Sequence, residues 1–259
     1  MKIALVGYGK MGHMIARAAE LRGHTVVCTV DPFAGDSTCL TKDSEVMVKA
    51  IMDSQAEGII EFSHPASVLG NINALIPTGI PLVVGTTGWH DNLPQISLKI
   101  EAQKSSLLYS SNFSVGVNVF YRMVAEAARL MASLEEYDVA VFESHHNQKA
   151  DSPSGTALEI AKRIMENIPR KTTLVTDPFT RRPESGELHL ASVRVGSVPG
   201  THTVFFDSPA DSIELTHTAR SREGFALGAV RAMEWLAVPE NDSIKRQGIF
   251  TMEDVFSDM

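Results

Sequence analysis

Over residues 1–110, short apolar runs alternate with segments in which apolar residues recur every three or four positions. Continuous short runs are typical of strands buried on both faces, and the longer spacing is typical of helices that bury one face. The predicted strands are Ile3–Val6, Thr25–Val30, Ile59–Phe62, Leu82–Val84 and Leu107–Tyr109. Strand–helix alternation predicts an α/β fold with a doubly wound parallel sheet.

After Asn112 the pattern changes. Helical spacing runs through Ser114–Leu134, and Ser114 is a residue type that caps helix N-termini. Strand-like runs then follow with only one clear helix among them, Thr156–Ile168. The predicted strands here are Val139–Phe142, Ser192–Val195, Thr203–Phe206 and Ile213–Thr218. Several strands with few helices predict a second, α+β domain.

The last helical pattern, Gly224–Val238, is expected to pack back on the first domain. We therefore predict a dinucleotide-binding domain of residues 1–112 plus 224–259, and a substrate-binding and oligomerisation domain of residues 113–223. The polar, proline-containing segment Pro169–Gly186 predicts an exposed loop.

Charge and composition narrow the functional classes. The chain has 31 acidic and 23 Lys and Arg residues, a formal net charge of −8. Such a chain repels nucleic acid and anionic membranes, so an anionic substrate needs a local cluster of cations. Two cysteines, Cys28 and Cys39, suit a reducing compartment. We find neither an apolar stretch long enough to span a membrane nor a signal-peptide pattern, and we expect a cytoplasmic protein.

A glycine-rich turn follows the first predicted strand. Its residues fit G-x-G-x-x-G and are Gly7, Tyr8, Gly9, Lys10, Met11 and Gly12. Glycines there allow a pyrophosphate to approach a helix N-terminus, as in Rossmann-type domains. Asp31 ends the second strand, where a carboxylate can accept hydrogen bonds from a ribose. Pro32 supplies no cation for a 2′-phosphate, which favours NADH; the alternative is an ordinary turn plus a surface aspartate.

Two further loops lie at carboxyl ends of predicted strands, the edge at which doubly wound sheets bind ligands. Taken alone, each also fits an ordinary turn. Their candidate cofactor-binding residues are Gly85, Thr86 and Thr87 after the fourth strand, and Ser110, Ser111, Asn112 and Phe113 after the fifth.

The densest polar cluster, Glu143–Thr156, begins at a strand end and finishes at a helix start. Adjacent His145 and His146 point to opposite faces of a strand, which argues against a shared metal ion. A histidine has a pKa near neutrality and can act as a general acid. Lys149 adds a cation, and Ser154-Gly155-Thr156 opens a helix that can bind a carboxylate. The alternative is a solvated polar loop.

With these motifs, the sequence resembles the 4-hydroxy-tetrahydrodipicolinate reductase (dihydrodipicolinate reductase) family, and the resemblance spans nearly the whole chain. The most specific pattern is HHxxKxDxPSGTA. The matching stretches are His145–Ala157, Val84–Gly88 (VGTTG), Asn112–Asn118 (NFSVGVN), Gly200–Thr203, Ile213–Leu215, Arg222 and Phe225–Ala229.

The resemblance implies NAD(P)H-dependent reduction of 4-hydroxy-tetrahydrodipicolinate to tetrahydrodipicolinate in the diaminopimelate route of lysine biosynthesis. By resemblance, His145 is the proton donor or acceptor and Lys149 a second proton donor. His146, Gly155 and Thr156 would bind the dicarboxylate, and the loops named above would bind NADH or NADPH. The resemblance implies a homotetramer joined through the sheet of the second domain. Two alternatives are another Rossmann-fold amino-acid dehydrogenase and a non-catalytic nicotinamide-binding redox sensor.

Overall fold

The computed structural model describes residues 1–238 and 246–257. It divides into a first unit, Met1–Val115 with Arg222–Met259, and a second unit, Gly116–Ser221. Part of the predicted C-terminal segment, residues 239–245 and 258–259, lies outside the described residues.

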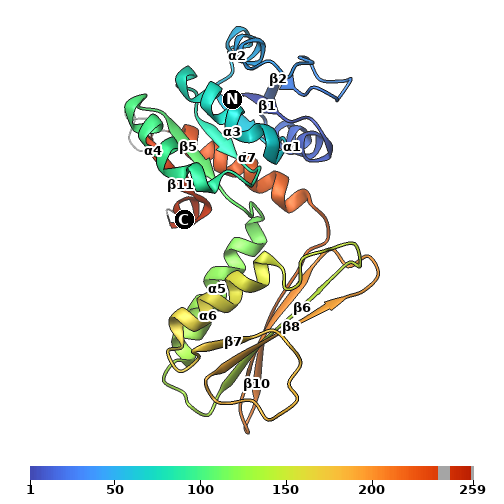
Figure 1. The fold of residues 1–259 in the computed structure, drawn as a ribbon, viewed down its shortest axis with the longest axis vertical. Coiled ribbons are helices and arrows are strands. Elements are labelled where there is room, and N and C mark those ends of the chain that lie inside the picture. Colours follow the sequence, from blue (N-terminus) through green and yellow to red (C-terminus); the bar gives the residue numbers. More distant parts are fainter. Residues whose placement is uncertain (239–245, 258–259) are drawn as a thin grey trace. The chain divides into compact units, whose positions relative to one another are not determined.

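The first unit is built on a sheet in which all neighbouring strands are parallel, in the order β11-β5-β4-β3-β1-β2 (Figure 1). This arrangement confirms the predicted α/β fold. The strands are β1 (Lys2–Val6), β2 (Thr25–Val30), β3 (Gly58–Glu61), β4 (Leu82–Val84), β5 (Ser106–Tyr109) and β11 (Gly248–Thr251).

Helices cover both faces of this sheet. The helices are α1 (Lys10–Leu21), α2 (Ser44–Asp53), α3 (Pro65–Leu75), α4 (Leu93–Ala102), α7 (Glu223–Ala237) and α8 (Met252–Ser257), with short 3₁₀ turns η1 (Ile76–Thr78) and η2 (His90–Asn92). Ile3 and Leu5 of β1 pack with α1, α7 and α8. Ala4 and Val6 of the same strand pack with α2, α3 and α4. Because alternate residues are buried on opposite faces, the strand reads as a continuous apolar run.

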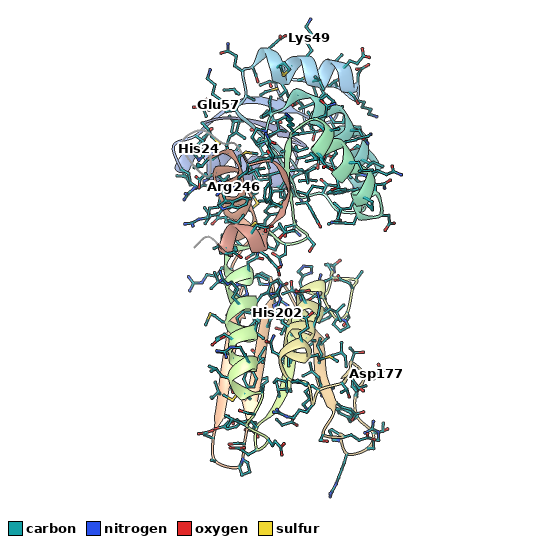
Figure 2. The ribbon with its side chains drawn as sticks, turned by 90° about the vertical axis from the view of Figure 1, so that its left-hand side faces the viewer. His24, Lys49, Glu57, Asp177, His202 and Arg246 are labelled. Atoms are coloured by element: carbon teal, nitrogen blue, oxygen red, sulfur yellow. The ribbon has the colours of Figure 1, made fainter. Side chains whose placement is uncertain are left out.

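The second unit is a mixed sheet in the order β10-β9-β6-β8-β7. Its elements are α5 (Val115–Met131), β6 (Asp138–His145), α6 (Gly155–Asn167), β7 (Thr173–Val175), β8 (Glu187–Arg194), β9 (Thr201–Asp207) and β10 (Ser212–Thr218). Val139 and Val141 of β6 are buried against α5 and α6. His202 (Figure 2) lies on β9, opposite Glu143 of β6. One face of the sheet is thus buried beneath two helices.

Parts of the predicted element pattern are wrong. The predicted exposed loop at residues 169–186 contains the strand β7, and Lys171 within it is buried. The Lys171 ammonium donates to the carbonyl of Glu187 and pairs with Asp138 at 2.6 Å. These two partners allow a charged side chain to be buried in this segment. Strand β8 begins at Glu187, five residues before the predicted start at Ser192.

One helical prediction differs in detail, and two short elements were not predicted. The helix predicted over residues 114–134 ends at Met131. Strand β11, of four residues, and helix α8, of six, were not predicted, because such short segments carry no clear periodicity.

The carbonyl of Phe113 closely abuts helix α7. A Cβ added at Gly228 of α7 would lie 1.6 Å from the Phe113 carbonyl oxygen. Helix α7 also contacts α1 and the strands β3, β4 and β5, so its position affects the whole first unit.

We expect Gly228→Ala to destabilise the protein by about 1–3 kcal/mol or more, because the new methyl group has no space. The matched control is Gly70→Ala in the exposed part of α3, where a Cβ meets no heavy atom within 4 Å. That change is expected to be neutral or to stabilise by up to about 1 kcal/mol. Urea unfolding of both variants measures the difference, and equal midpoints would contradict this packing.

Candidate active site

The glycine-rich loop lies between β1 and α1. Gly7 has φ +91°, and a Cβ there would lie 2.2 Å from the carbonyl oxygen of Phe62. A Cβ at Gly12 would lie 2.4 Å from the carbonyl oxygen of Gly7. The fold therefore requires both glycines. Gly9, the N-cap of α1, has no heavy atom within 4 Å of its Cβ position, which leaves space for an anion to approach the helix N-terminus.

Asp31 directly follows β2 and is tied to this loop. Its Oδ2 accepts from the backbone N–H of Tyr8 at 2.8 Å, and its Oδ1 accepts from Phe33 and Ala34 at 2.7 and 3.0 Å. Burial raises the pKa of Asp31, but these backbone donors outweigh it and lower the pKa below the ordinary value. An ionised carboxylate thus lies beside the glycine loop, as ribose binding requires.

A pocket of about 210 Å³ lies within the first unit. Its lining residues are Met11, Phe62, Gly85, Ser111, Phe113, Arg222 and Phe225. Four of these residues, Met11, Gly85, Ser111 and Phe113, are predicted cofactor-binding residues, whereas Phe62, Arg222 and Phe225 are not. Phe62 could have been found, because it follows the carboxyl end of β3, the same edge as the other loops.

The remaining cofactor candidates do not line this pocket. The hydroxyl of Ser110 donates to the carbonyl of Asn112 and accepts from its N–H, which closes the turn after β5. The carbonyl of Thr86 accepts from the Trp89 indole at 3.0 Å. Thr87 and Lys10 are exposed.

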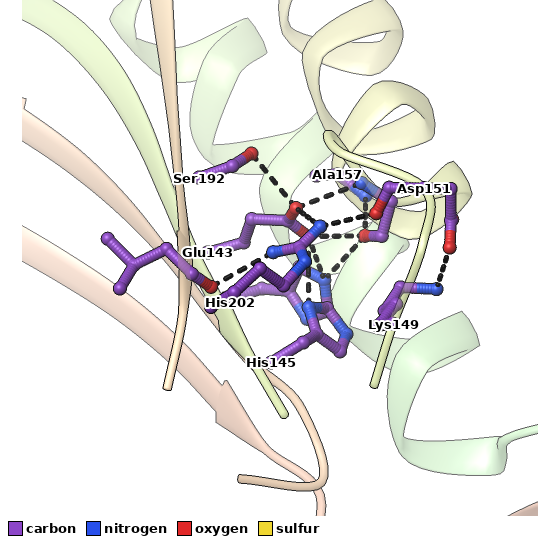
Figure 3. A network of polar contacts seen from close by, with 10 residues as sticks. Glu143, His145, Lys149, Asp151, Ala157, Ser192 and His202 are labelled. Atoms are coloured by element: carbon purple, nitrogen blue, oxygen red, sulfur yellow. Dashed lines mark hydrogen bonds and ion pairs between the residues drawn. The ribbon is translucent and has the colours of Figure 1, made fainter. Parts of the chain in front are cut away.

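In the second unit, Glu143 and His145 project from the same face of β6, because they are two residues apart on a strand. Both are buried, and so is His202 on the neighbouring strand β9. Figure 3 shows these three side chains converging beside the loop that precedes α6.

Glu143 is the centre of this buried polar network. Its Oε1 accepts from the Ser154 N–H at 2.9 Å, the Ser192 hydroxyl at 2.9 Å and the Arg194 guanidinium at 3.0 Å. Its Oε2 accepts from the Ser154 hydroxyl and lies 3.4 Å from Nε2 of His202. Burial raises the pKa of Glu143, but these donors outweigh it and hold the pKa well below its usual range.

His145 lies against this carboxylate, with Nδ1 3.2 Å from Oε2 of Glu143. Burial lowers the pKa of His145 to about 4, and the nearby His202, Lys149 and Arg194 act in the same direction. The pKa of His145 in the ligand-free protein is therefore below the near-neutral value expected from its residue type. An anionic substrate beside the ring would raise this pKa again.

The loop and helix after β6 hold the other predicted substrate-binding residues. Lys149 pairs with Asp151 at 2.7 Å, so its ammonium already has a partner. Ser154 is the N-cap of α6, and its buried hydroxyl accepts from the Ala157 N–H. A Cβ at Gly155 would meet no heavy atom within 4 Å, so its backbone is open to a ligand. His146 is half-buried.

Glu143, His145 and His202 also have possible metal-ligating atoms within 4.8 Å of one another. Arg194 and Ser154 already bind the Glu143 carboxylate, and a dication would lie close to the Arg194 guanidinium. We therefore interpret the cluster as a hydrogen-bonded network and assign it no metal.

Comparisons with known proteins place these features in a family. Residues 1–113 match the model described as dihydrodipicolinate reductase, N-terminus, and residues 116–256 match its C-terminus. The 4-hydroxy-tetrahydrodipicolinate reductase of Christiangramia forsetii is 39% identical and covers 100% of this chain and 99% of its own. That of Archaeoglobus fulgidus is 35% identical, with 98% and 99% covered.

Solved structures show the same fold. A dipicolinate-bound dihydrodipicolinate reductase from Paenisporosarcina has a TM-score of 0.72 at 22% identity, covering 97% of each chain. The diaminopimelate (DAP) dehydrogenase of C. glutamicum, in complex with DAP, has a TM-score of 0.54 at 14% identity, with 99% and 98% covered.

The low pKa of His145 has a consequence for stability. Its folded-state pKa of about 4 lies below the ordinary value of 6.5, so between these values the unfolded state binds more protons. Stability therefore falls as the pH falls through this window. We expect His145→Gln to remove on the order of 2 kcal/mol of the loss between pH 7 and pH 5.

Urea unfolding at several pH values checks this, with His90→Gln at an exposed position as the control. Parallel stability curves for wild type and His145→Gln would refute the assignment.

Proposed function

The chain belongs to the dihydrodipicolinate reductase family, and we infer from this that it reduces 4-hydroxy-tetrahydrodipicolinate to tetrahydrodipicolinate with a pyridine nucleotide. This reaction is a step of the diaminopimelate route to lysine. The observation that carries the inference is the match of both family models and of full-length relatives to this chain. It is supported by the buried His145 beside the N-terminus of α6.

The first unit fits a dinucleotide. We propose that the N-terminus of α1 binds the pyrophosphate at Gly9, where the open space lies, and that Asp31 binds the adenosine ribose. The loops after β4 and β5 would complete this site. When bound, the reduced nicotinamide supplies a hydride.

The second unit fits a small dicarboxylate. The open backbone at Gly155 and the helix N-terminus at Thr156 suit one carboxylate. Lys149 and His146 would bind the substrate beside it, with Lys149 exchanging Asp151 for the ligand. Lys149 and the helix N-terminus would supply the local positive potential with which a chain of net charge −8 holds a dianion.

The reaction needs a proton as well as a hydride. Loss of the 4-hydroxyl group and a C3 hydrogen as water gives a C3=C4 double bond conjugated with the imine. A hydride added at C4 then leaves electron density that a proton at C3 must quench. We propose His145 as the proton donor, because the negative charge of the substrate favours the protonated ring. Lys149 stabilises the developing negative charge and, as the family resemblance implies, is a second donor.

We further propose that the enzyme is a cytoplasmic homotetramer joined through the sheet of the second unit. The sheet face opposite α5 and α6 carries the half-buried Ala140, Phe142 and Phe205, and Val193 on it is 41% exposed. Such a face is suited to association. Among the described residues, no helix has the length and apolar character to cross a membrane.

The test of this function is oxidation of NADH coupled to a dihydrodipicolinate synthase reaction, repeated with NADPH. We expect turnover, with NADH used at least as well as NADPH, because Asp31 repels a 2′-phosphate at short range and Pro32 supplies no cation. A nicotinamide-binding sensor would bind NADH without turnover.

The control for cofactor choice is Lys10→Ala, because Lys10 is the exposed cation on the glycine loop. A clear kinetic preference for NADPH that Lys10→Ala abolishes would overturn the role of Asp31 and assign NADPH selection to Lys10.

The assignment of the proton donor predicts two different kinetic defects. His145→Gln is expected to lower kcat by ~10²–10⁴-fold with little change in KM, the range usual for loss of a general acid. Lys149→Ala is expected to change both kcat and KM, because substrate binding and transition-state stabilisation are lost together.

Both variants should bind NADH normally in a fluorescence titration, since neither residue belongs to the glycine loop. A His145→Gln enzyme with near-normal kcat would remove His145 from the mechanism and direct attention to His146.

A further inference from the structure

Glu143 is a fully buried carboxylate to which neither the family motif nor the proposed reaction assigns a role. It lies outside the HHxxKxDxPSGTA pattern, two residues before its first residue, His145, on β6. A buried carboxylate is costly unless it is paired and hydrogen-bonded, so its retention in a small substrate-binding unit needs a reason.

The two carboxylate oxygens of Glu143 have different partners. Oε1 accepts from Ser192, Arg194 and the backbone of Ser154, which anchors the side chain to β8 and to the start of α6. Oε2 faces the two imidazoles, 3.2 Å from Nδ1 of His145 and 3.4 Å from Nε2 of His202. The first oxygen therefore fixes the position of the second against the His145 ring.

The other nitrogen of His145 faces a different environment. A Cβ at Gly200 would lie 2.9 Å from Nε2 of His145, and the φ of Gly200, +149°, is one that residues with side chains rarely adopt. Gly200, in the loop before β9, thus places no side chain over Nε2. Nδ1, by contrast, has no hydrogen-bond partner of standard geometry among the described residues, and a carboxylate oxygen lies 3.2 Å away.

Charge distinguishes Glu143 from the other groups around the ring. The charged or titratable groups that act on His145 are Glu143 of β6, Lys149 of the following loop, Arg194 of β8 and His202 of β9. Of these four, only Glu143 favours a protonated imidazole. Removing it would leave the proton donor surrounded by groups that oppose its charged form.

We propose that Glu143 is a positioning residue for the reaction: its buried carboxylate holds His145 with a proton on Nδ1 and leaves Nε2 to exchange the proton with the substrate. When Nε2 gives up its proton, the ring becomes neutral and keeps the Nδ1 proton beside Oε2. The Ser154 hydroxyl donates to the same carboxylate and caps α6, so the group that positions the donor is tied to the helix that would bind the substrate. This proposal rests on the proposed function.

The first experiment is the pH dependence of kcat for Glu143→Gln, a substitution that keeps the shape and removes the charge. We expect the pKa of the proton donor in the substrate complex to fall by about one unit or more. At pH 7 kcat should then fall by about tenfold, and the deficit should shrink as the pH is lowered. NADH binding should not change.

The matched control is Glu187→Gln on β8. Glu187 is also a carboxylate of this sheet paired with an arginine, Arg181, and its side chain is 9% exposed. Glu187 is not among the charged groups that act on His145, so its loss should leave the pH profile of kcat unchanged. A Glu143→Gln enzyme whose kcat falls equally at every pH, or does not fall, overturns the proposal.

A second measurement needs only the wild-type fold. Nitrogen-15 spectra of histidine-labelled protein at neutral pH report the tautomer of His145, with His145→Gln identifying its signals. We expect the neutral ring to carry its proton on Nδ1; a proton on Nε2 would overturn the proposal even if Glu143→Gln fails to fold. Absence of turnover by the wild type would refute the proposed function instead, so the two failures are distinguishable.

Discussion

A carboxylate removed from water must be surrounded by donors, and this requirement organises the candidate active site around Glu143. Meeting it needs Ser192 and Arg194 from the neighbouring strand and Ser154 from the start of α6. The same contacts bring β6, β8 and α6 together at one end of the sheet. The His145 ring and the N-terminus of α6 consequently belong to one rigid polar network.

In the first unit, neighbouring atoms approach the backbone so closely at three positions that only glycine fits there. Gly7 and Gly12 lie where a Cβ would strike a backbone oxygen, and Gly85 lies where it would strike the Phe62 ring. A side chain therefore does not fit at any of these three positions. Asp31 then accepts the N–H of Tyr8, so the ribose-binding candidate and the phosphate-binding loop are joined by a direct hydrogen bond.

Sequence reasoning succeeded where a local pattern determines the structure. The strands of the first unit are continuous apolar runs, and the glycine loop carries a spaced motif, so both could be predicted. It failed where contacts between residues far apart in the sequence determine whether a side chain is buried and what surrounds it. Lys171 is polar but buried because Glu187 and Asp138 meet it, and nothing local in residues 169–186 indicates this. The environment of His145 was missed for the same reason, since His202 and Arg194 lie on other strands.

The low pKa of His145 is compatible with proton donation because the site is incomplete without its substrate. Lys149, Arg194 and His202 place positive charge or hydrogen-bond donors near the ring, and burial adds to their effect. A dianion bound at the N-terminus of α6 would oppose this effect, because negative charge near the ring favours its protonated form. The ring would then gain a proton when substrate binds, which couples substrate binding to activation of the acid.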